Sequence, residues 1–286
     1  MNDTAELQNL KRLEPLLACP SCGKPMLVGA ERITCTGCNA GYPLYEGVAL
    51  LALMGTPAAA RQEKSDAGES SDPYQQQYQD LSEAAEYNAE YKQKLFKRMS
   101  TAREYRLLRR LLSSQGRCQT LLDVPSGGGR LSAQMAEYTD LLIEADIARG
   151  QVLYGRKHGR VATQQVWMTA SAFHLPFRDN SIDGIVSCRL CHHLPTNAER
   201  VALVTELLRV ARRFVLMTFF DYRSFKNLLR RARRPFDGQP PKMTMKIEEV
   251  EALARQGGAK LVDAPYLAPI SSGHRYALMV KSGAGA

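Results

Sequence analysis

The chain has 286 residues, of which 44% are hydrophobic, 23% charged and 7% aromatic, and its formal net charge is +9. This composition excludes disordered and fibrous classes and is typical of a soluble globular protein, while the length predicts one large domain with a smaller companion. No apolar run approaches the roughly 20 residues that cross a bilayer, and the first fifteen residues lack the apolar core of a secretory signal. We therefore expect a cytoplasmic protein.

Two paired-cysteine motifs lie near the N-terminus. Cys19 and Cys22 form the first, and Cys35 and Cys38 form the second, thirteen residues after Cys22. Two such turns can close a tetrahedral zinc site with four thiolates. The total of seven cysteines is odd, which disfavours a disulfide framework. Because four protein ligands leave no open position for water, we predict a structural rather than a catalytic metal site.

About forty residues around these motifs, up to the ending Tyr42-Pro-Leu-Tyr-Glu-Gly-Val-Ala-Leu-Leu51, resemble a family of small zinc ribbons. Members of that family activate methyltransferases of the translation machinery as separate subunits. The resemblance implies a helper domain, which we assign to residues 1–54. Similar ribbons are fused to ribosomal-RNA methyltransferases, which favours a substrate from the translation machinery.

A polar linker is predicted next, over residues 55–80, because Gly55–Asp72 is made of small, polar and charged residues. A helical pattern rich in Gln, Glu, Ala and Leu overlaps its end and runs from about Tyr74 to Ser114. Its tyrosines form a packing stripe or a lid over a cofactor pocket, and the first alternative is favoured. They are Tyr74, Tyr78, Tyr87 and Tyr91.

Strand-like and helical patterns alternate through the remaining residues, 81–286. The predicted elements are strands at Thr120–Val124, Leu141–Ala145, Val161–Met168, Gly184–Cys188 and Phe214–Phe219, and helices from Leu131, after Ala145, near Ala198–Val210 and at Thr244–Arg255. Alternation of this kind builds an α/β fold with a doubly wound, mostly parallel sheet. Lys260–Val262 and Tyr276–Lys281 would add antiparallel strands, which gives seven strands in total.

The organising stretch of this domain is Leu121-Leu-Asp-Val-Pro-Ser-Gly-Gly-Gly-Arg130. It reads as a buried strand, a glycine-rich turn and the start of a helix, an arrangement that brings backbone N–H groups close to a nucleotide-like cofactor. A nicotinamide cofactor requires a third glycine three residues after Gly129, but that position is Ser132. A dehydrogenase is therefore disfavoured.

Three further features accompany the turn. Asp146 closes the second strand, nineteen residues after Gly127, where a carboxylate can accept both ribose hydroxyls. The segment Ser171-Ala-Phe-His-Leu-Pro-Phe177 follows the third strand and would border an adenine. The segment Asn180-Ser-Ile-Asp-Gly-Ile-Val-Ser187 leads an acid into the fourth strand.

Together these motifs resemble the class I S-adenosylmethionine-dependent methyltransferases over roughly residues 80–281. The matching positions are Asp123, Gly127, Gly129, Asp146, Ala172, Leu175-Pro-Phe177, Asp179, Ser181 and Asp183. The resemblance implies that S-adenosylmethionine is held by Asp123, Pro125, Ser126, Gly127, Gly129, Asp146, Ser171 and Ala172. Two positions depart from the family pattern: Pro125 replaces the first glycine of the turn, and Ser171 replaces an acid that often contacts the adenine amino group.

The segment Cys188-Arg-Leu-Cys-His-His-Leu194 follows the fourth strand. Its spacing also fits haem attachment, which requires an export route, or a second metal site. We favour cysteines that pack as small apolar residues. A neighbouring histidine, His193 in our prediction, would then be available as a general base.

Two classes of methyl acceptor stay open. The His-His-Leu-Pro segment favours a small molecule, a lipid or a glycan. The ribbon and the basic segment 223–242, with seven basic residues against one acid, favour ribosomal or transfer RNA, although a solvated helix face explains the charge equally well. A catalytically silent scaffold protein is a third hypothesis, motivated by Pro125 and Ser171.

Overall fold

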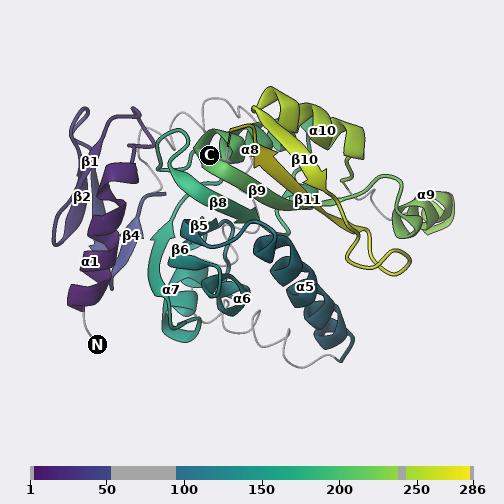
Figure 1. Cartoon of the computed structure of the whole chain (residues 1–286), viewed down its shortest axis with the longest axis horizontal. Coiled ribbons are helices and arrows are strands. Elements are labelled where there is room, and N and C mark those ends of the chain that lie inside the picture. Colours follow the sequence, from purple (N-terminus) through teal and green to yellow (C-terminus); the bar gives the residue numbers. More distant parts are fainter. Residues whose placement is uncertain (1–2, 53–94, 238–242, 284–286) are drawn as a thin grey trace.

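The computed structural model describes residues 3–52, 95–237 and 243–283. Residues 118–281 contribute seven strands to its sheet: β5 (Cys118–Asp123), β6 (Thr139–Asp146), β7 (Gln164–Thr169), β8 (Ile182–Ser187), β9 (Ala211–Phe220), β10 (Ala259–Asp263) and β11 (His274–Lys281). Their order is β7-β6-β5-β8-β9-β11-β10 (Figure 1). The first five are parallel, and β11 pairs antiparallel with both β9 and β10. The predicted doubly wound α/β fold is confirmed.

Helices cover both faces of the central sheet. They are α5 (Leu95–Ser113), α6 (Ser132–Ala136) and α7 (Arg149–His158) on one face, and α8 (Asn197–Val210) and α10 (Ile247–Gln256) on the other. Successive residues of β5 separate the two layers: Leu121 packs with the α5 leucines, and Leu122 packs with those of α8. Burial on both faces explains why these strands read as continuous apolar runs rather than alternating ones.

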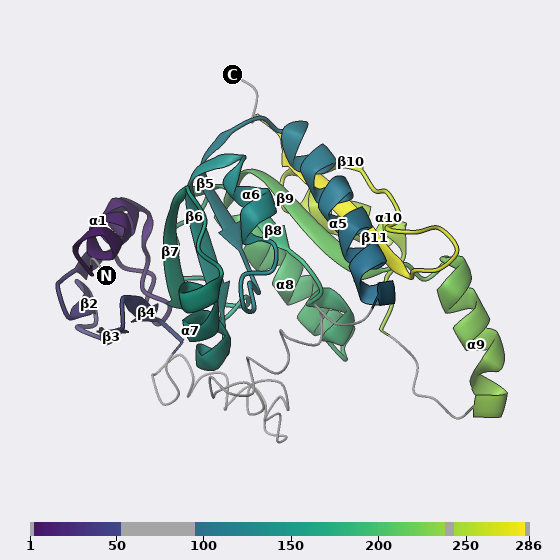
Figure 2. The ribbon, with the colours of Figure 1, turned by 90° about the horizontal axis from the view of Figure 1, so that it is seen from below.

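The N-terminal residues form α1 (Asp3–Leu13), the short helix η1 (Glu14–Leu16) and strands β1 (Met26–Val28), β2 (Arg32–Cys35), β3 (Gly41–Tyr45) and β4 (Val48–Leu50). Figure 2 shows them at one end of the sheet, beside β7. β4 pairs in parallel with β7, so that Ala49 lies opposite Met168. The sheet therefore has eleven strands in the described residues, in place of the predicted seven. The extra pairing covers an edge strand whose backbone would otherwise be exposed.

Two further groups of contacts, among others, join the ribbon to the larger part of the chain. Glu6 of α1 forms ion pairs with Arg156 at 2.7 Å and Arg160 at 3.0 Å. The backbone N–H of Ala18 donates to the carbonyl of Pro176 at 3.0 Å, beside a bridge between Leu17 and Phe177. The second contact reaches the loop that follows β7, which also contains the predicted site residues Ser171 and Ala172.

Most predicted elements are confirmed with shifted ends. The helix after the glycine turn is short, because α6 covers only Ser132–Ala136. α8 begins at a capping box in which Thr196 and Glu199 satisfy each other's backbone N–H groups. Residues 55–80 and the tyrosines at 74, 78, 87 and 91 lie outside the described residues, so the predicted linker, the lid and the division at residues 54 and 81 stay predictions.

Candidate cofactor site and candidate metal site

The glycine turn joins the carboxyl end of β5 to α6. Gly127 and Gly129 have φ values of +54° and +76°, a region that favours glycine. The nearest atom to a Cβ built at Gly127 would be Gln151 Oε1, 4.0 Å away, so the turn leaves open space on that side. Ser126 donates its backbone N–H to Ala145 at 2.9 Å, which ties the turn to β6. Pro125 follows a cis peptide bond. The turn therefore has the shape of a ligand cradle.

Asp146 lies at the carboxyl end of β6 and faces the turn. Its Oδ2 accepts the backbone N–H of Gly127 at 2.9 Å, and its Oδ1 accepts that of Ala148 at 2.9 Å. The side chain is fully buried, and burial raises the pKa of Asp146 to about 6 against the lowering effect of these N–H groups. Each carboxyl oxygen keeps further lone pairs that can accept hydrogen bonds from a ligand.

Asp123 is the last residue of β5, directly before the turn. Its side chain is 1% exposed, and neither carboxyl oxygen has a hydrogen-bond partner. Burial, reinforced by Glu144, raises the pKa of Asp123 well above its ordinary value. Ser187, at the carboxyl end of the adjacent strand β8, likewise has a buried hydroxyl without a partner. Buried polar groups are nearly always paired in proteins, so these two point to a polar ligand at this edge.

The loop after β7 holds Ser171 and Ala172, both buried. The hydroxyl of Ser171 accepts the backbone N–H of Phe173 at 3.3 Å and can still form one further hydrogen bond. The same loop is held from both sides, because Pro176 bonds to the ribbon and the N–H of Leu175 donates to Glu206 of α8 at 2.6 Å. The structure thus brings the predicted cofactor residues to one edge of the sheet, on three consecutive strand ends.

A buried charge cluster beside the turn was not predicted. Glu104 of α5 is 1% exposed and forms ion pairs with Arg130 at 2.6 Å and Arg189 at 2.9 Å. The hydroxyl of Tyr276 lies 3.1 Å from the same carboxylate. Burial alone would raise the pKa of Glu104, but Arg130 and Arg189 outweigh it and lower the pKa to about 2. One sequence signal was available: Glu104 is the only acid in α5.

Histidines and an aromatic ring gather at the carboxyl ends of β8 and β9. The ring of His192, in the short helix η2 (Cys191–His193), lies 4.3 Å from that of Phe220 and 4.9 Å from that of His274. Burial, followed by the charge of Arg189, lowers the pKa of His274 to about 4. The predicted base His193 is exposed and lies 4.3 Å from His192, on the outside of this cluster. His274 was missed because it is far away in sequence.

The cysteines of the same segment are packing residues. Cys188 and Cys191 are 5% and 2% exposed, and burial raises the pKa of both thiols. The Cys191 thiol donates to the sulfur of Met245 at 3.4 Å. In the described part of the chain they belong to no metal-binding cluster.

Asp221, which follows β9, is already fully paired. Its Oδ2 accepts from Tyr266 at 2.6 Å and from Arg275 at 2.8 Å, and its Oδ1 accepts the backbone N–H of Arg223. This residue shapes the start of the next helix.

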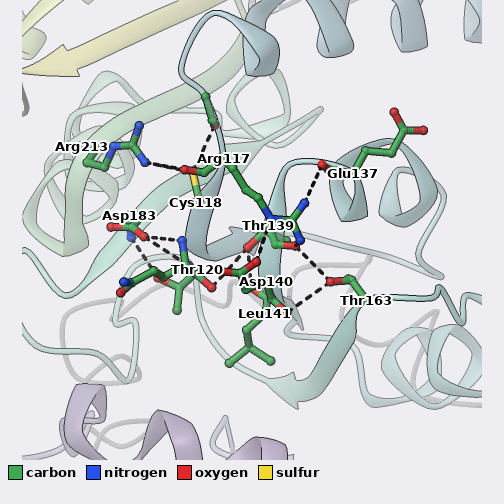
Figure 3. A network of polar contacts seen from close by, with 12 residues as sticks. Arg117, Cys118, Thr120, Glu137, Thr139, Asp140, Leu141, Thr163, Asp183 and Arg213 are labelled. Atoms are coloured by element: carbon green, nitrogen blue, oxygen red, sulfur yellow. Dashed lines mark hydrogen bonds and ion pairs between the residues drawn. The ribbon is translucent and has the colours of Figure 1, made fainter.

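Asp183 has a structural role at the opposite edge of the sheet. It accepts the backbone N–H groups of Gln119 and Thr120 and pairs with Arg212, so it ties β8 to β5 and β9. Figure 3 shows this network at the amino ends of the strands, where Arg117 also binds the first residues of β6. The methyltransferase-like acid at this position therefore stabilises the sheet.

The four ribbon cysteines form the candidate metal site. Their sulfurs all lie within 4.8 Å of one another, and two pairs are 3.4 and 3.8 Å apart. A tetrahedral zinc site with Zn–S bonds of about 2.3 Å separates its sulfurs by about 3.8 Å. Burial opposes thiolate formation at Cys35, but the N–H groups of Cys38 and Gly37 outweigh it and lower the pKa to about 6. The donor set fits a structural zinc ion, and Cys19, Cys22, Cys35 and Cys38 would hold it.

Comparison with known proteins agrees with this geometry. Residues 122–216 match the family described as "Methyltransferase domain". No curated protein sequence matches the chain. Residues 122–216 therefore match a methyltransferase domain, and they lie within a class I fold that is preceded by a four-cysteine ribbon.

Solved structures share the fold at low sequence identity. Magnesium protoporphyrin IX methyltransferase from Synechocystis PCC 6803, crystallised with S-adenosylhomocysteine, aligns with 66% of this chain and 88% of its own, at 15% identity and a TM-score of 0.56. The N-methyltransferase NodS from Bradyrhizobium japonicum WM9, also with S-adenosylhomocysteine, aligns with 67% of this chain and 90% of its own, at 13% identity and a TM-score of 0.52. At such identities the likeness establishes the fold alone.

Proposed function

We propose that the chain transfers a methyl group from S-adenosylmethionine to a small-molecule, lipid or glycan acceptor. The observation that carries the proposal is the hydrogen bond between Asp146 and the N–H of Gly127, because it joins an acidic strand end to a glycine cradle at the carboxyl edge of a doubly wound sheet. Nucleotide-like ligands bind at this edge in such folds.

We assign each part of the cofactor a partner among the described residues. Asp146 would accept the ribose hydroxyls, the loop at Ser171 and Ala172 would border the adenine, and the turn from Pro125 to Gly129 would hold the amino-acid end. The unpaired carboxyl group of Asp123 fits the ammonium group, since a cation nearby stabilises a buried carboxylate.

The bound cofactor supplies a methyl group that is already activated for transfer. The protein's residues then need only align the acceptor and exclude water. His193 is the general base that we propose for acceptors that must lose a proton, and its position beside His192 is compatible with a proton relay through the histidine cluster.

The acceptor class rests on the same cluster. Phe220, His192 and His274 form a compact aromatic cluster at the carboxyl ends of β8 and β9, which suits a small or partly apolar acceptor. The relative from Synechocystis is named for a porphyrin and the one from Bradyrhizobium for N-methylation. RNA is the alternative acceptor, favoured by the ribbon and by the basic segment 223–242. A silent scaffold protein is the other alternative.

Calorimetric titration of the zinc-loaded chain with S-adenosylmethionine and S-adenosylhomocysteine tests the cofactor. We expect one binding site per chain for each compound. Absence of detectable binding for both would overturn the proposal and leave the scaffold alternative. A matched titration with NAD, for which the turn lacks the third glycine, should give no heat.

A further inference from the structure

An amphipathic helix stands out at the end of the sheet opposite the ribbon. α9 (Phe225–Asp237) begins five residues after β9 and projects from the body of the protein (Figures 1 and 2). It therefore starts beside the carboxyl edge that carries the candidate cofactor site. Among the helices of residues 3–52, 95–237 and 243–283, none has the length and apolarity of a membrane span.

The helix is attached to the protein by its polar side. Asn227 is 2% exposed, and its side-chain amide donates to the carbonyl of Asp221 at 2.8 Å. Lys226 Nζ donates to the carbonyl of Ser271 at 2.9 Å, in the loop between β10 and β11. These bonds fix which side of α9 faces outward.

The outward side is apolar. Phe225, Leu228 and Leu229 are 55%, 54% and 39% exposed, and their spacing of three and four residues places them on one stripe of the helix. Ile270, in the loop that Lys226 contacts, is 74% exposed. A helix on the surface of a soluble protein normally turns its apolar stripe toward the protein core. In α9 the apolar stripe faces outward instead.

Basic residues flank the stripe on both sides. Lys226 and Arg233 lie on one flank and Arg231 on the other, according to their 100° spacing around the helix. No acid occurs between Tyr222 and Arg233. Arg231 also lies 3.8 Å from the centre of the Tyr222 ring, which is itself 40% exposed. An apolar stripe with cations on both flanks is the pattern of helices that lie in the surface of anionic membranes.

From this arrangement we propose that α9, with Tyr222 and Ile270, is a membrane-docking element that binds anionic lipid surfaces. Its apolar stripe enters the boundary between head groups and acyl chains, and its flanking cations contact lipid phosphates. Docking in this way holds the carboxyl edge of the sheet close to the membrane surface. The proposal concerns binding only and does not depend on methyl transfer.

Two other occupants fit the surface less well. RNA would pair its phosphates with the cations and stack its bases on Phe225 and Tyr222, but it would leave the aliphatic side chains of Leu228, Leu229 and Ile270 without an apolar partner. A second copy of the chain would bury the stripe, but a two-fold contact places the same cations of both copies near one another. An anionic lipid surface satisfies both the stripe and the charges.

Co-sedimentation of the full, zinc-loaded chain with vesicles tests the proposal, in the absence of S-adenosylmethionine. Vesicles of phosphatidylcholine with phosphatidylglycerol should bind the chain at least about tenfold more tightly than phosphatidylcholine alone. Combined Leu228→Glu and Leu229→Glu substitutions should weaken binding by about tenfold or more, as should Lys226→Glu with Arg233→Glu. Leu27→Glu is the matched control, since Leu27 is 55% exposed on β1 at the far end of the sheet.

Three results would overturn the proposal: no binding to anionic vesicles, equal binding by the Leu228/Leu229 variant, or an equal loss in the Leu27 variant. Retention of RNA by the same chain without vesicle binding would assign the surface to nucleic acid. A dimer mass in light scattering that the Leu228/Leu229 variant abolishes, again without vesicle binding, would assign it to self-association. Circular dichroism of each variant confirms that the fold is retained.

Discussion

The backbone N–H of Ala18 donates to the carbonyl of Pro176 across 3.0 Å, and the next residue after Ala18 is the candidate zinc ligand Cys19. Arg178 extends the contact by donating its own N–H to the carbonyl of Leu16 at 2.9 Å. The metal site therefore adjoins the loop that we propose to border the adenine. Ordering of the first cysteine pair is physically coupled to the position of that loop.

Loss of the metal should accordingly weaken cofactor binding as well as folding. We expect Cys19→Ser to lower the zinc content and the melting temperature, and to weaken the affinity for S-adenosylmethionine by about tenfold, the cost of ordering roughly one loop residue. Mass spectrometry, thermal unfolding and calorimetry measure the three effects. Cys118→Ser, in a buried cysteine far from the ribbon, should leave zinc content and affinity unchanged. An undiminished affinity in a metal-free Cys19→Ser chain would contradict this coupling.

Asp146→Asn should weaken the binding of S-adenosylmethionine by roughly ten- to a hundredfold, since a charge-assisted hydrogen bond is worth about 1.5–3 kcal/mol. The variant also places an amide where the N–H groups of Gly127 and Ala148 now donate. Asp183→Asn is the control at the opposite edge of the sheet. It should lower the melting temperature and leave the affinity unchanged. Unchanged affinity in Asp146→Asn together with weakened affinity in Asp183→Asn would show that Asp146 is not part of the proposed site.

Glu104→Gln should lower the free energy of unfolding by about 3 kcal/mol, because it leaves two partly buried arginines without their counter-ion. Urea unfolding at neutral pH measures this change. Glu137→Gln is a suitable comparison, because Glu137 is about half exposed where it pairs with Arg109, and it should cost at most about 1 kcal/mol. Similar losses in both variants would show that the buried cluster contributes no special stability.

The pH dependence of the same pair of variants gives a second test. The pKa of Glu104 is about 2 in the folded chain, below its ordinary value of 4.5. Its stabilising contribution is therefore complete above about pH 4.5 and is lost as the pH falls toward 2. The wild-type chain should lose stability over this interval more steeply than Glu104→Gln does. Parallel curves would contradict the assignment.

The lowered pKa of His274 predicts a second pH interval over which the stability of the fold changes. The pKa of His274 falls from 6.5 to about 4 on folding. Between these two pH values the ring is therefore protonated in the unfolded chain and neutral in the folded chain. Stability is then complete above about pH 6.5 and declines by up to about 3 kcal/mol as the pH falls to 4. His274→Gln should flatten this part of the stability curve. An unchanged slope between pH 6.5 and 4 would show that the ring is accessible to protons.

Local sequence patterns predicted the parallel strands and the glycine-rich turn because each depends on adjacent residues. The run before Pro125 is apolar enough to be buried on both faces, and Asp146 stands at a fixed distance from Gly127. The spacing within and between the two cysteine pairs predicted the four-cysteine cluster in the same way.

Features that depend on tertiary contacts were not predictable. Glu104 meets Arg189 across 85 residues, and the ring of His274 reaches that of His192 across a similar distance. The parallel pairing of β4 with β7 likewise joins residues that lie far apart in the sequence, such as Ala49 and Met168. To predict that the apolar face of α9 points outward, one would have to know that Asn227 is buried.

The most direct test of the account is methyl transfer itself. The zinc-loaded chain is incubated with S-adenosylmethionine labelled at its methyl group and with lipid, small-molecule and RNA fractions from cells that lack the protein. We predict label in the lipid or small-molecule fraction, strongly reduced by Asp146→Asn at limiting cofactor and retained by Leu27→Glu. Label in the RNA fraction would contradict the proposed acceptor class, and cofactor binding without label in any fraction would favour a catalytically silent protein.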